Sequence, residues 1–366
     1  MEEMDKIKKM EKLINKLNNK EFGIYFFTLD TKGNPVAGVA NIYENAKLLR
    51  ELGYNAQILH EKNDYHNVGQ WLGEEYDEIP HVSIESQELT IDGSDFIVIP
   101  EVFSSIMAQV KNFPCKKIVL CQSYSYALEL IPPGVRWDLN FNFNDVITTS
   151  ETQAKYIQNM FKGIKTHVVP VSIPDYFKKS EEPKKPIVAI VSRNQQDTVA
   201  LVKRFYLEYP MFKWVKLEDL RGMSRRDFAD SVGESCLAVW VDPNAGFGTF
   251  PIEAMECETP VIGIIPDMIP EYLVGRNDDE GVVLKNNGIW LTNKLDIPAA
   301  INEYLMSWIE DNVPNVLYDN MAKTTGLYTV ENQKNIISEV YENLVSDRVG
   351  ELTDVLNKSK LEIDEN

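Results

Sequence analysis

Two glycines and a carboxylate in the second half of the chain have the types and the spacing of an anion-binding loop. Gly246 and Gly248 follow the apolar run 237–241, and Pro251 and Glu253 come shortly after them. Glycine lets a backbone approach a ligand closely, and proline suits the first turn of a helix because its missing N–H would be unpaired there. A helix that begins behind such a loop presents free N–H groups and the positive end of its dipole, which suits a phosphate. Glu253 then falls about one turn into the helix, where it can accept hydrogen bonds from ribose hydroxyls.

A purely structural interpretation of the same segment is also open. A Gly-Phe-Gly sequence can form a tight turn that binds nothing, and a glutamate in the first turn of a helix offsets the helix dipole. The choice between the two depends on the elements around the segment and on the residues at the ends of neighbouring strands.

Apolar runs and helical stretches alternate through most of the chain. The first half has apolar runs, fit for buried strands, at 23–28, 55–60, 96–100, 117–121, 146–149 and 167–170. The second half has further runs at 187–191, 213–216, 237–241 and 261–265. Short apolar runs separated by helices are typical of parallel strands in a doubly wound sheet. The charged, proline-rich stretch 172–186 lies between the two series and predicts a link between two domains.

The pattern predicts an α/β fold of two Rossmann-like, doubly wound domains with a cleft between them at the carboxyl ends of their strands. We place a helical extension at 1–20, the first domain at 21–175, the second at 176–330, a helix at 331–348 and a polar acidic tail at 349–366. The N-terminal helix has apolar residues at helical spacing with lysines between them. It either packs on its own domain, which we favour, or touches a membrane or a partner.

The composition is that of a globular protein. The chain has 366 residues, of which 44% are hydrophobic and 25% charged, and a net charge of −19. This acidic balance disfavours passive attraction to nucleic acid or anionic lipid. No apolar stretch has transmembrane length, the start lacks a signal-peptide core, and the four cysteines have no metal-binding spacing. We therefore expect a cytoplasmic protein with reduced thiols.

The segment 242–263 resembles the donor-site signature of retaining GT-B glycosyltransferases of family 4, also called glycosyl transferases group 1. That signature is an acid, Gly-Phe-Gly, a proline, Glu-Ala-Met and a Pro-Val-Ile strand, and this chain has Ala-Gly-Phe-Gly-Thr-Phe-Pro-Ile-Glu-Ala-Met from Ala245 onward. Glu253 has the place of the second acid, whereas Ala245 stands in the place of the first. The resemblance extends over about residues 21–345, and the glycines of a further Gly-Gly-x-x-Glu motif are replaced in the segment 267–271.

The resemblance implies transfer of a sugar from a nucleoside diphosphate donor, preferably a UDP-sugar, with retention of configuration and without a metal or another cofactor. It also implies that the helix at 331–348 returns to the first domain. Candidate acceptors are a glycan, a lipid-linked sugar or, as for viral enzymes of this fold, a modified DNA base. The alternative from another class is a non-catalytic nucleotide-sugar binder, for which Ala245 is the main argument. The sequence has no signal for an oligomeric state.

The resemblance also assigns roles to residues that follow the predicted strands. Three are expected to support the reaction, at the diphosphate, the ribose and the sugar or acceptor respectively: Arg193, Glu253 and Glu101. The donor is expected to contact Gly38, Arg193, Arg221, Met223, Gly246, Phe247, Gly248, Thr249 and Glu253. The acceptor is expected to contact Asn34, Glu101, Gln122 and Ser123. Most of these have a plain structural alternative as a turn, a cap or a surface ion pair, and Ser224 is expected to cap the helix that begins at Arg225.

Overall fold

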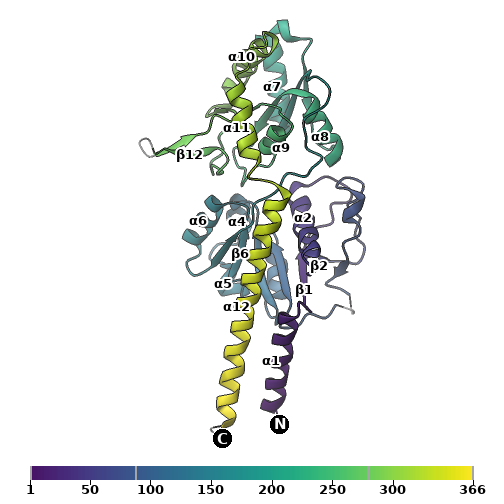
Figure 1. Cartoon of the computed structure of the whole chain (residues 1–366), viewed down its shortest axis with the longest axis vertical. Helices are drawn as coiled ribbons and strands as arrows, with labels where there is room; N and C mark the ends of the chain where they lie inside the picture. The colour runs from purple at the N-terminus through teal and green to yellow at the C-terminus, as the bar shows by residue number, and fades with distance from the viewer. Residues whose placement is uncertain (1, 87–88, 278–280, 365–366) are drawn as a thin grey trace. The chain divides into compact units, whose positions relative to one another are not determined.

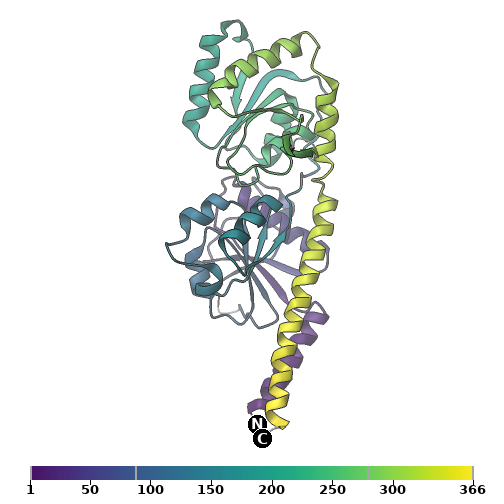
Figure 2. The same cartoon turned by 90° about the vertical axis from the view of Figure 1, so that its left-hand side faces the viewer.

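The computed structural model describes residues 2–86, 89–277 and 281–364, and the chain divides into two compact units (Figures 1 and 2). The first unit comprises Met1–Thr149, Ala154–Val169 and Lys334–Asn366, and the second comprises Ser150–Gln153 and Pro170–Gln333. Each unit is built around a parallel sheet of its own.

The first unit has a seven-stranded sheet in the order β3-β2-β1-β4-β5-β6-β7, in which every neighbouring pair is parallel. Its strands are β1 (Gly23–Phe27), β2 (Asn55–His60), β3 (His81–Ser83), β4 (Phe96–Pro100), β5 (Lys116–Cys121), β6 (Asp145–Thr148) and β7 (Lys165–Val168). β1 and β4 are buried along their whole length, as their continuous apolar runs predict. The strand order reverses between β1 and β4, and doubly wound sheets bind ligands at the carboxyl ends of strands at such a point.

Short helices connect these strands. They are α2 (Ala37–Glu51), α3 (Ser104–Val110), α4 (Tyr124–Leu130), α5 (Trp137–Phe141) and α6 (Glu151–Met160), with a 3-10 helix η1 (Glu74–Tyr76). One core cluster packs α3, α5 and α6 against the sheet, and Trp137, Phe143 and Ile157 are completely buried in it. This packing fixes the ends of β4 and β5, from which the candidate residues of this unit extend.

The second unit has a five-stranded parallel sheet in the order β14-β11-β10-β8-β9 and a separate antiparallel pair, β12 with β13. The strands are β8 (Lys185–Ser192), β9 (Lys216–Asp219), β10 (Ser235–Val241), β11 (Val261–Ile264), β12 (Val274–Asn277), β13 (Gly281–Leu284) and β14 (Ile289–Leu291). The prediction of a strand at 213–216 is wrong, because β9 begins only at Lys216 and the half-exposed Trp214 lies in the turn before it. Here the strand order reverses between β8 and β10.

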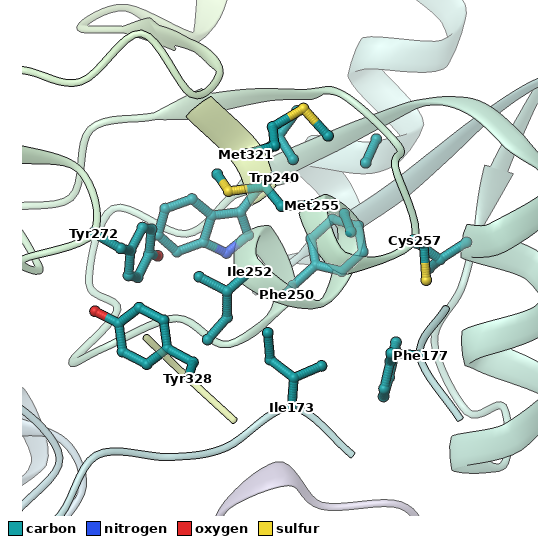
Figure 3. Close-up of a cluster of buried hydrophobic side chains, with 14 of the residues drawn as sticks. Ile173, Phe177, Trp240, Phe250, Ile252, Met255, Cys257, Tyr272, Met321 and Tyr328 are labelled. Carbon is teal, nitrogen blue, oxygen red and sulfur yellow. The ribbon is translucent and has the colours of Figure 1, made fainter. Parts of the chain in front are cut away.

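The helices of the second unit are α7 (Gln195–Glu208), α8 (Arg225–Glu234), α9 (Phe250–Glu256), α10 (Ile297–Ile309) and α11 (Asn315–Thr325), with 3-10 helices η2 (Pro210–Phe212) and η3 (Lys294–Asp296). A buried aromatic cluster joins three of these helices, α8, α9 and α11, to this sheet, whereas α7 and α10 pack in a separate cluster. The aromatic cluster includes Trp240 on β10 and Phe250 and Ile252 on α9, with Tyr272 beside them (Figure 3). It therefore anchors both ends of the loop that contains Gly246 and Gly248.

The C-terminal helix α12 extends over Val330–Asp364. The predicted end of this helix at 348 is therefore wrong, because the chain stays helical from there through Asp364, and the last two residues of the predicted tail lie outside the described residues. The added turns have a partner, since α1 (Glu2–Asn18) runs alongside them (Figures 1 and 2) and Lys360 pairs with Glu11 at 3.1 Å. Leucines from both helices are buried, namely Leu13, Leu17, Leu352 and Leu356.

Polar contacts also fix α12 to the first sheet. Arg348 donates to the carbonyl oxygen of Gly93 at 2.8 and 2.9 Å, and Lys116 on β5 pairs with Glu351 at 2.7 Å. The segment from Lys334 onward accordingly belongs to the first unit. No helix in the described part of the chain has both the length and the apolar content needed to cross a membrane.

Candidate active site

The loop between β10 and α9 is held through its carbonyl groups. The Tyr272 hydroxyl lies 3.0 Å from the carbonyl oxygen of Phe247 and 2.8 Å from that of Gly248, and it donates to both. Gly248 has a φ of +76°, and a Cβ atom at this position would lie 2.4 Å from the Trp240 ring. Only glycine fits there, because any larger residue would meet both the backbone strain and the indole.

The backbone N–H groups of 246–249 are the donors that this arrangement leaves open. None of them has an acceptor among the residues that the structure describes. Pro251 lies in the first turn of α9, as the sequence predicts, and the N-cap position is Thr249, whose side chain makes no capping hydrogen bond. Open N–H groups beside the positive end of a helix dipole are donors that suit an anion.

Glu253 is the carboxylate nearest to this loop in the sequence, and only one of its oxygens is used. The residue is buried, and Oε1 accepts a hydrogen bond from Nη2 of Arg225 at 2.7 Å. No donor in the described residues bonds to Oε2. Glu253 therefore has one oxygen fixed within the protein and a second that is available as an acceptor.

The sequence analysis did not identify Arg225 as the partner of Glu253. Arg225 is the first residue of α8, whose N-cap Ser224 accepts from the backbone N–H of Asp227 at 3.2 Å, so the predicted cap is confirmed. A cation at the positive end of a helix is unfavourable unless another group compensates for it. That mismatch is the one signal in the sequence that could have indicated a partner for Arg225 elsewhere in the fold.

Arg193 follows β8 and reaches the end of the neighbouring strand β10. Its Nε donates to Oδ1 of Asp242 at 2.7 Å, and its Nη2 donates to Oδ2 at 3.2 Å and to the carbonyl of Asn244 at 3.2 Å. The bidentate pair forms because parallel neighbours bring their carboxyl ends to one edge. The Arg193 side chain is 35% exposed, and its contact with a diphosphate stays a prediction.

Ala245 occupies the place of the missing acid and is packed inside the unit. It is 3% exposed and belongs to the cluster formed around Trp240 and Tyr272. Asp242, three residues earlier, is already paired with Arg193. This edge thus has no free carboxylate at either position to face a donor sugar.

The remaining donor-side candidates lie in the turn between β9 and α8. Arg221 pairs with Asp219 across this turn, and Gly222 between them and α8 has a φ of +79°. Met223 is partly buried against the aromatic cluster, and its Sδ accepts from the Ser231 hydroxyl at 3.6 Å. Both residues are thus held in the turn that leads to Arg225, and their contact with a base stays a prediction.

In the first unit, Gln122 connects the end of β5 to the first turn of α2. Its Nε2 donates to the carbonyl of Gly38 at 3.1 Å, and its Oε1 accepts from Asn41 at 2.9 Å. A Cβ on Gly38 would lie 3.4 Å from Nε2, which is a tight contact. The structure thus brings together Gly38 and Gln122, which were predicted separately, and uses both in one hydrogen-bonded contact.

Glu101 and Ser123 meet at the ends of β4 and β5. Glu101 is 2% exposed, and its Oε1 accepts from the backbone N–H of Ser123 at 2.8 Å. Its Oε2 is buried without a hydrogen-bond partner in the part of the chain that is described. Burial disfavours the charged form and raises the pKa of Glu101 to about 7. Such a carboxyl group can hold or release a proton near neutral pH.

The loop after β1 holds the last predicted acceptor residue, Asn34. Its side chain and its backbone N–H both donate to the carbonyl of Thr31, at 2.9 and 3.0 Å, beside Gly33 with a φ of +78°. Asn34 closes this turn, and its contact with an acceptor stays a prediction.

A group of aromatic rings and imidazoles at the end of β2 was not predicted. His60 and His81 are joined by a 2.9 Å hydrogen bond between Nε2 and Nδ1, and Tyr65 stacks on both rings. Burial lowers the pKa of each histidine to about 4, so both are neutral near pH 7. The position of His60 at the carboxyl end of the run 55–60 was the available signal.

No three His, Cys, Asp or Glu side chains come together as a candidate metal site within residues 2–86, 89–277 and 281–364. The expectation that no metal or cofactor takes part stays a prediction.

Two Rossmann-like units, each with loops at the carboxyl edge of a parallel sheet, define a GT-B fold, and solved structures confirm this prediction. The Anabaena HepE protein in complex with UDP and glucose matches with a TM-score of 0.64 and 15% identity, over 89% of this chain and 100% of that one. The sucrose-phosphate synthase of Thermosynechococcus elongatus matches with a TM-score of 0.62 and 13% identity, over 89% of this chain and 100% of that one.

Sequence comparison finds a glucosyltransferase among curated proteins. An alpha-1,6-glucosyltransferase of Actinobacillus pleuropneumoniae serotype 7 (strain AP76) is 24% identical over 259 residues, which covers 67% of this chain and 73% of that protein. No family model matches the chain.

Proposed function

We propose that this chain is a glycosyltransferase that moves a sugar from a nucleoside diphosphate donor, with UDP-glucose as the first candidate, to a hydroxyl-bearing acceptor. The observation that carries the proposal is the loop 246–249, whose open N–H groups are followed, one turn into α9, by a carboxylate with one available oxygen. The similarity to a glucosyltransferase and to a structure that holds UDP and glucose supports the choice of donor.

The donor side follows from the chemistry of these groups. The N–H groups of 246–249 and the dipole of α9 would bind the diphosphate, and Arg193 would add a positive charge as that group departs. Oε2 of Glu253 would accept hydrogen bonds from the ribose hydroxyls. Positioning and electrostatic stabilisation then supply the rate enhancement.

We propose that the sugar keeps its anomeric configuration. The bond between the sugar C1 and the diphosphate oxygen breaks, a new bond from C1 to the acceptor oxygen forms, and the departing diphosphate takes the acceptor proton. Glu101, Gln122, Ser123 and Asn34 are the proposed acceptor-side residues. Their amide, hydroxyl and carboxyl groups suit a glycan or a lipid-linked sugar, whereas a net charge of −19 works against a DNA acceptor.

A second candidate is a nucleotide-sugar binder without turnover. The packed Ala245 favours it, because the acid of the resembled signature is absent from the edge that would face the donor sugar. Turnover of a donor separates the two candidates. In either case, four buried free thiols support the proposed cytoplasmic location.

The test is a thermal-shift screen with UDP-, GDP- and ADP-sugars, followed by assays for sugar release and transfer. A ligand at one hundred times its dissociation constant should stabilise the protein by about 2.7 kcal/mol. Slow release of glucose from UDP-glucose supports the enzyme, and a shift without release or transfer supports the binder. Absence of any shift with every nucleotide contradicts both. NMR of the transfer product would show whether the anomeric configuration is retained.

Glu253→Ala should weaken binding of the nucleotide by about 1–3 kcal/mol, the scale of a lost charge-assisted hydrogen bond. Calorimetric titration with UDP measures the change. Unchanged affinity in a folded variant would remove Glu253 from the site.

A further inference from the structure

Arg225 and Glu253 form a buried ion pair in the second unit. Nη2 of Arg225 donates to Oε1 of Glu253 at 2.7 Å, and the two side chains are 17% and 4% exposed. They lie at the beginnings of α8 and α9, on helices that approach the same edge of the sheet. The pair thus fixes the orientation of one carboxylate at the start of the helix that follows the glycine loop.

Two aromatic rings hold the guanidinium of Arg225. Its Cζ lies 4.9 Å from the ring centre of Phe177 and 5.7 Å from that of Phe228. A planar guanidinium stacks well on aromatic faces, whereas an ammonium on a flexible stem does not reproduce this geometry. Arg225 therefore holds Glu253 rigidly. A lysine at this position would keep the positive charge but not the stacked, planar geometry.

The pair uses Oε1 and leaves Oε2 without a donor in the described residues. A carboxylate that is held through one oxygen presents the other in a fixed direction, so less side-chain entropy is lost when a ligand binds. A buried carboxylate without its cation would be costly and would not keep this orientation.

We propose that Arg225 is a positioning residue that sets Glu253 to accept hydrogen bonds from the 2′ and 3′ hydroxyls of the donor ribose, and so selects ribonucleotides. This inference rests on the proposed function, because it gives Glu253 a ribose ligand. If Arg225 only joined α8 to α9, its replacement would destabilise the fold or weaken the binding of all nucleotides equally. The selectivity for ribose hydroxyls distinguishes the two roles.

The experiment compares the dissociation constants of UDP and 2′,3′-dideoxy-UDP by calorimetry. The wild-type protein should bind UDP about tenfold or more tightly, the equivalent of a hydrogen bond to a charged group. Arg225→Lys should reduce this ratio to about two- or threefold, because it keeps the charge but loses the stacked, planar fork. Glu253→Gln should reduce the ratio similarly, and the double variant should lose little more, since both residues act through one contact.

Arg348→Lys is the matched control. Arg348 is 15% exposed and pairs with Glu351 at 2.8 Å in the first unit, so it resembles Arg225 in its own burial and in pairing with a glutamate, although Glu351 is more exposed than Glu253. This variant should leave the ratio at the wild-type value. Phe228→Leu is a second test if Arg225→Lys does not fold, because it removes one supporting ring and retains both charges; it should lower the ratio partly.

The outcomes separate the inference from the proposed function. A wild-type protein that binds neither nucleotide contradicts the proposed function. A wild-type protein that binds both equally, or a folded Arg225→Lys variant that keeps the full ratio, overturns the inference alone. Equal weakening of both ligands in Arg225→Lys also overturns it, because that result describes a structural residue. A full ratio in Phe228→Leu overturns it in the same way.

Discussion

The carboxyl edges of the two sheets handle charge in different ways. At the edge of the second unit, three carboxylates are each paired with an arginine: Asp242 with Arg193, Asp219 with Arg221 and Glu253 with Arg225. At the edge of the first unit, amides and hydroxyls predominate, and Glu101 is a buried carboxyl group with no cation paired to it in the described residues.

This difference indicates what each edge can bind. In the second unit these three arginines are each held by a carboxylate, and the N–H groups of 246–249 are donors without an acceptor in the described residues. In the first unit, neutral donors and acceptors suit hydroxyl groups, and Glu101 can exchange a proton near neutral pH. The comparison therefore supports a diphosphate at the second edge and a hydroxyl-bearing acceptor at the first.

The largest effect should come from adding an unpaired charge to the second edge. Ala245→Glu would place a carboxylate among buried aromatic side chains, because Ala245 is 3% exposed and Arg193 is already paired with Asp242. We expect a loss of about 3–5 kcal/mol in the free energy of unfolding, the scale of an uncompensated buried charge. Urea denaturation measures it.

Ala200→Glu on the exposed face of α7 is the control for this substitution. It should change stability by less than about 0.5 kcal/mol, as is usual for surface sites. If Ala245→Glu were equally mild, the side chain at 245 would have access to solvent, and the second edge could accommodate an acid after all.

The next effect contrasts two glycines with nearly the same backbone conformation, one at each edge. Gly248 has a φ of +76° and Gly33 a φ of +78°, but a Cβ would meet the Trp240 ring at 2.4 Å in the first case and nothing within 4 Å in the second. Gly33→Ala should cost about 1 kcal/mol for the left-handed backbone alone. Gly248→Ala should cost about 3 kcal/mol, since overpacking is added to the same strain.

Thermal denaturation of the two glycine variants measures this difference. Equal costs would mean that the indole of Trp240 moves aside easily. The contact with Trp240 would then not restrict residue 248, and the two loops would tolerate a side chain equally.

A smaller effect, on the pH dependence of stability, should test the role of Glu101 at the edge of the first unit. Its pKa is raised to about 7 from an ordinary 4.5, so its stabilising contribution is complete below pH 4.5 and is lost as the pH rises through 7. The side chain of Glu101→Gln stays neutral at every pH. The free energy of unfolding of this variant minus that of the wild type should therefore be about 2 kcal/mol larger at pH 8 than at pH 5. Parallel denaturation curves at the two pH values measure the change; a pH-independent difference would show that Glu101 titrates normally.

The sequence predicts the strands and the glycine loop because their signals are local. The apolar run 237–241 forms β10, Gly248 adopts a positive φ, and Pro251 lies in the first turn of α9. The two-domain GT-B prediction succeeded for the same reason, since repeated apolar runs and one proline-rich link suffice to indicate it.

The partners of the site residues were not predictable in this way. Arg225 and Glu253 are 28 positions apart, and Gln122 and Gly38 are 84 apart, so each contact depends on how helices pack on the sheet. The burial of Ala245 likewise depends on distant aromatic residues. The length of α12 was underestimated because polar residues after 348 suggested a tail, whereas α1 provides a packing partner that is far away in the sequence.

The most direct test of the account is amide hydrogen exchange of the wild-type protein with and without UDP. We predict slower exchange at 246–249, where the N–H groups have no acceptor in the described residues, and little change in the loop that holds Gly33 and Asn34 at the first edge. A UDP complex that leaves 246–249 unchanged and protects the first edge instead would contradict the assignment of the diphosphate to the second unit.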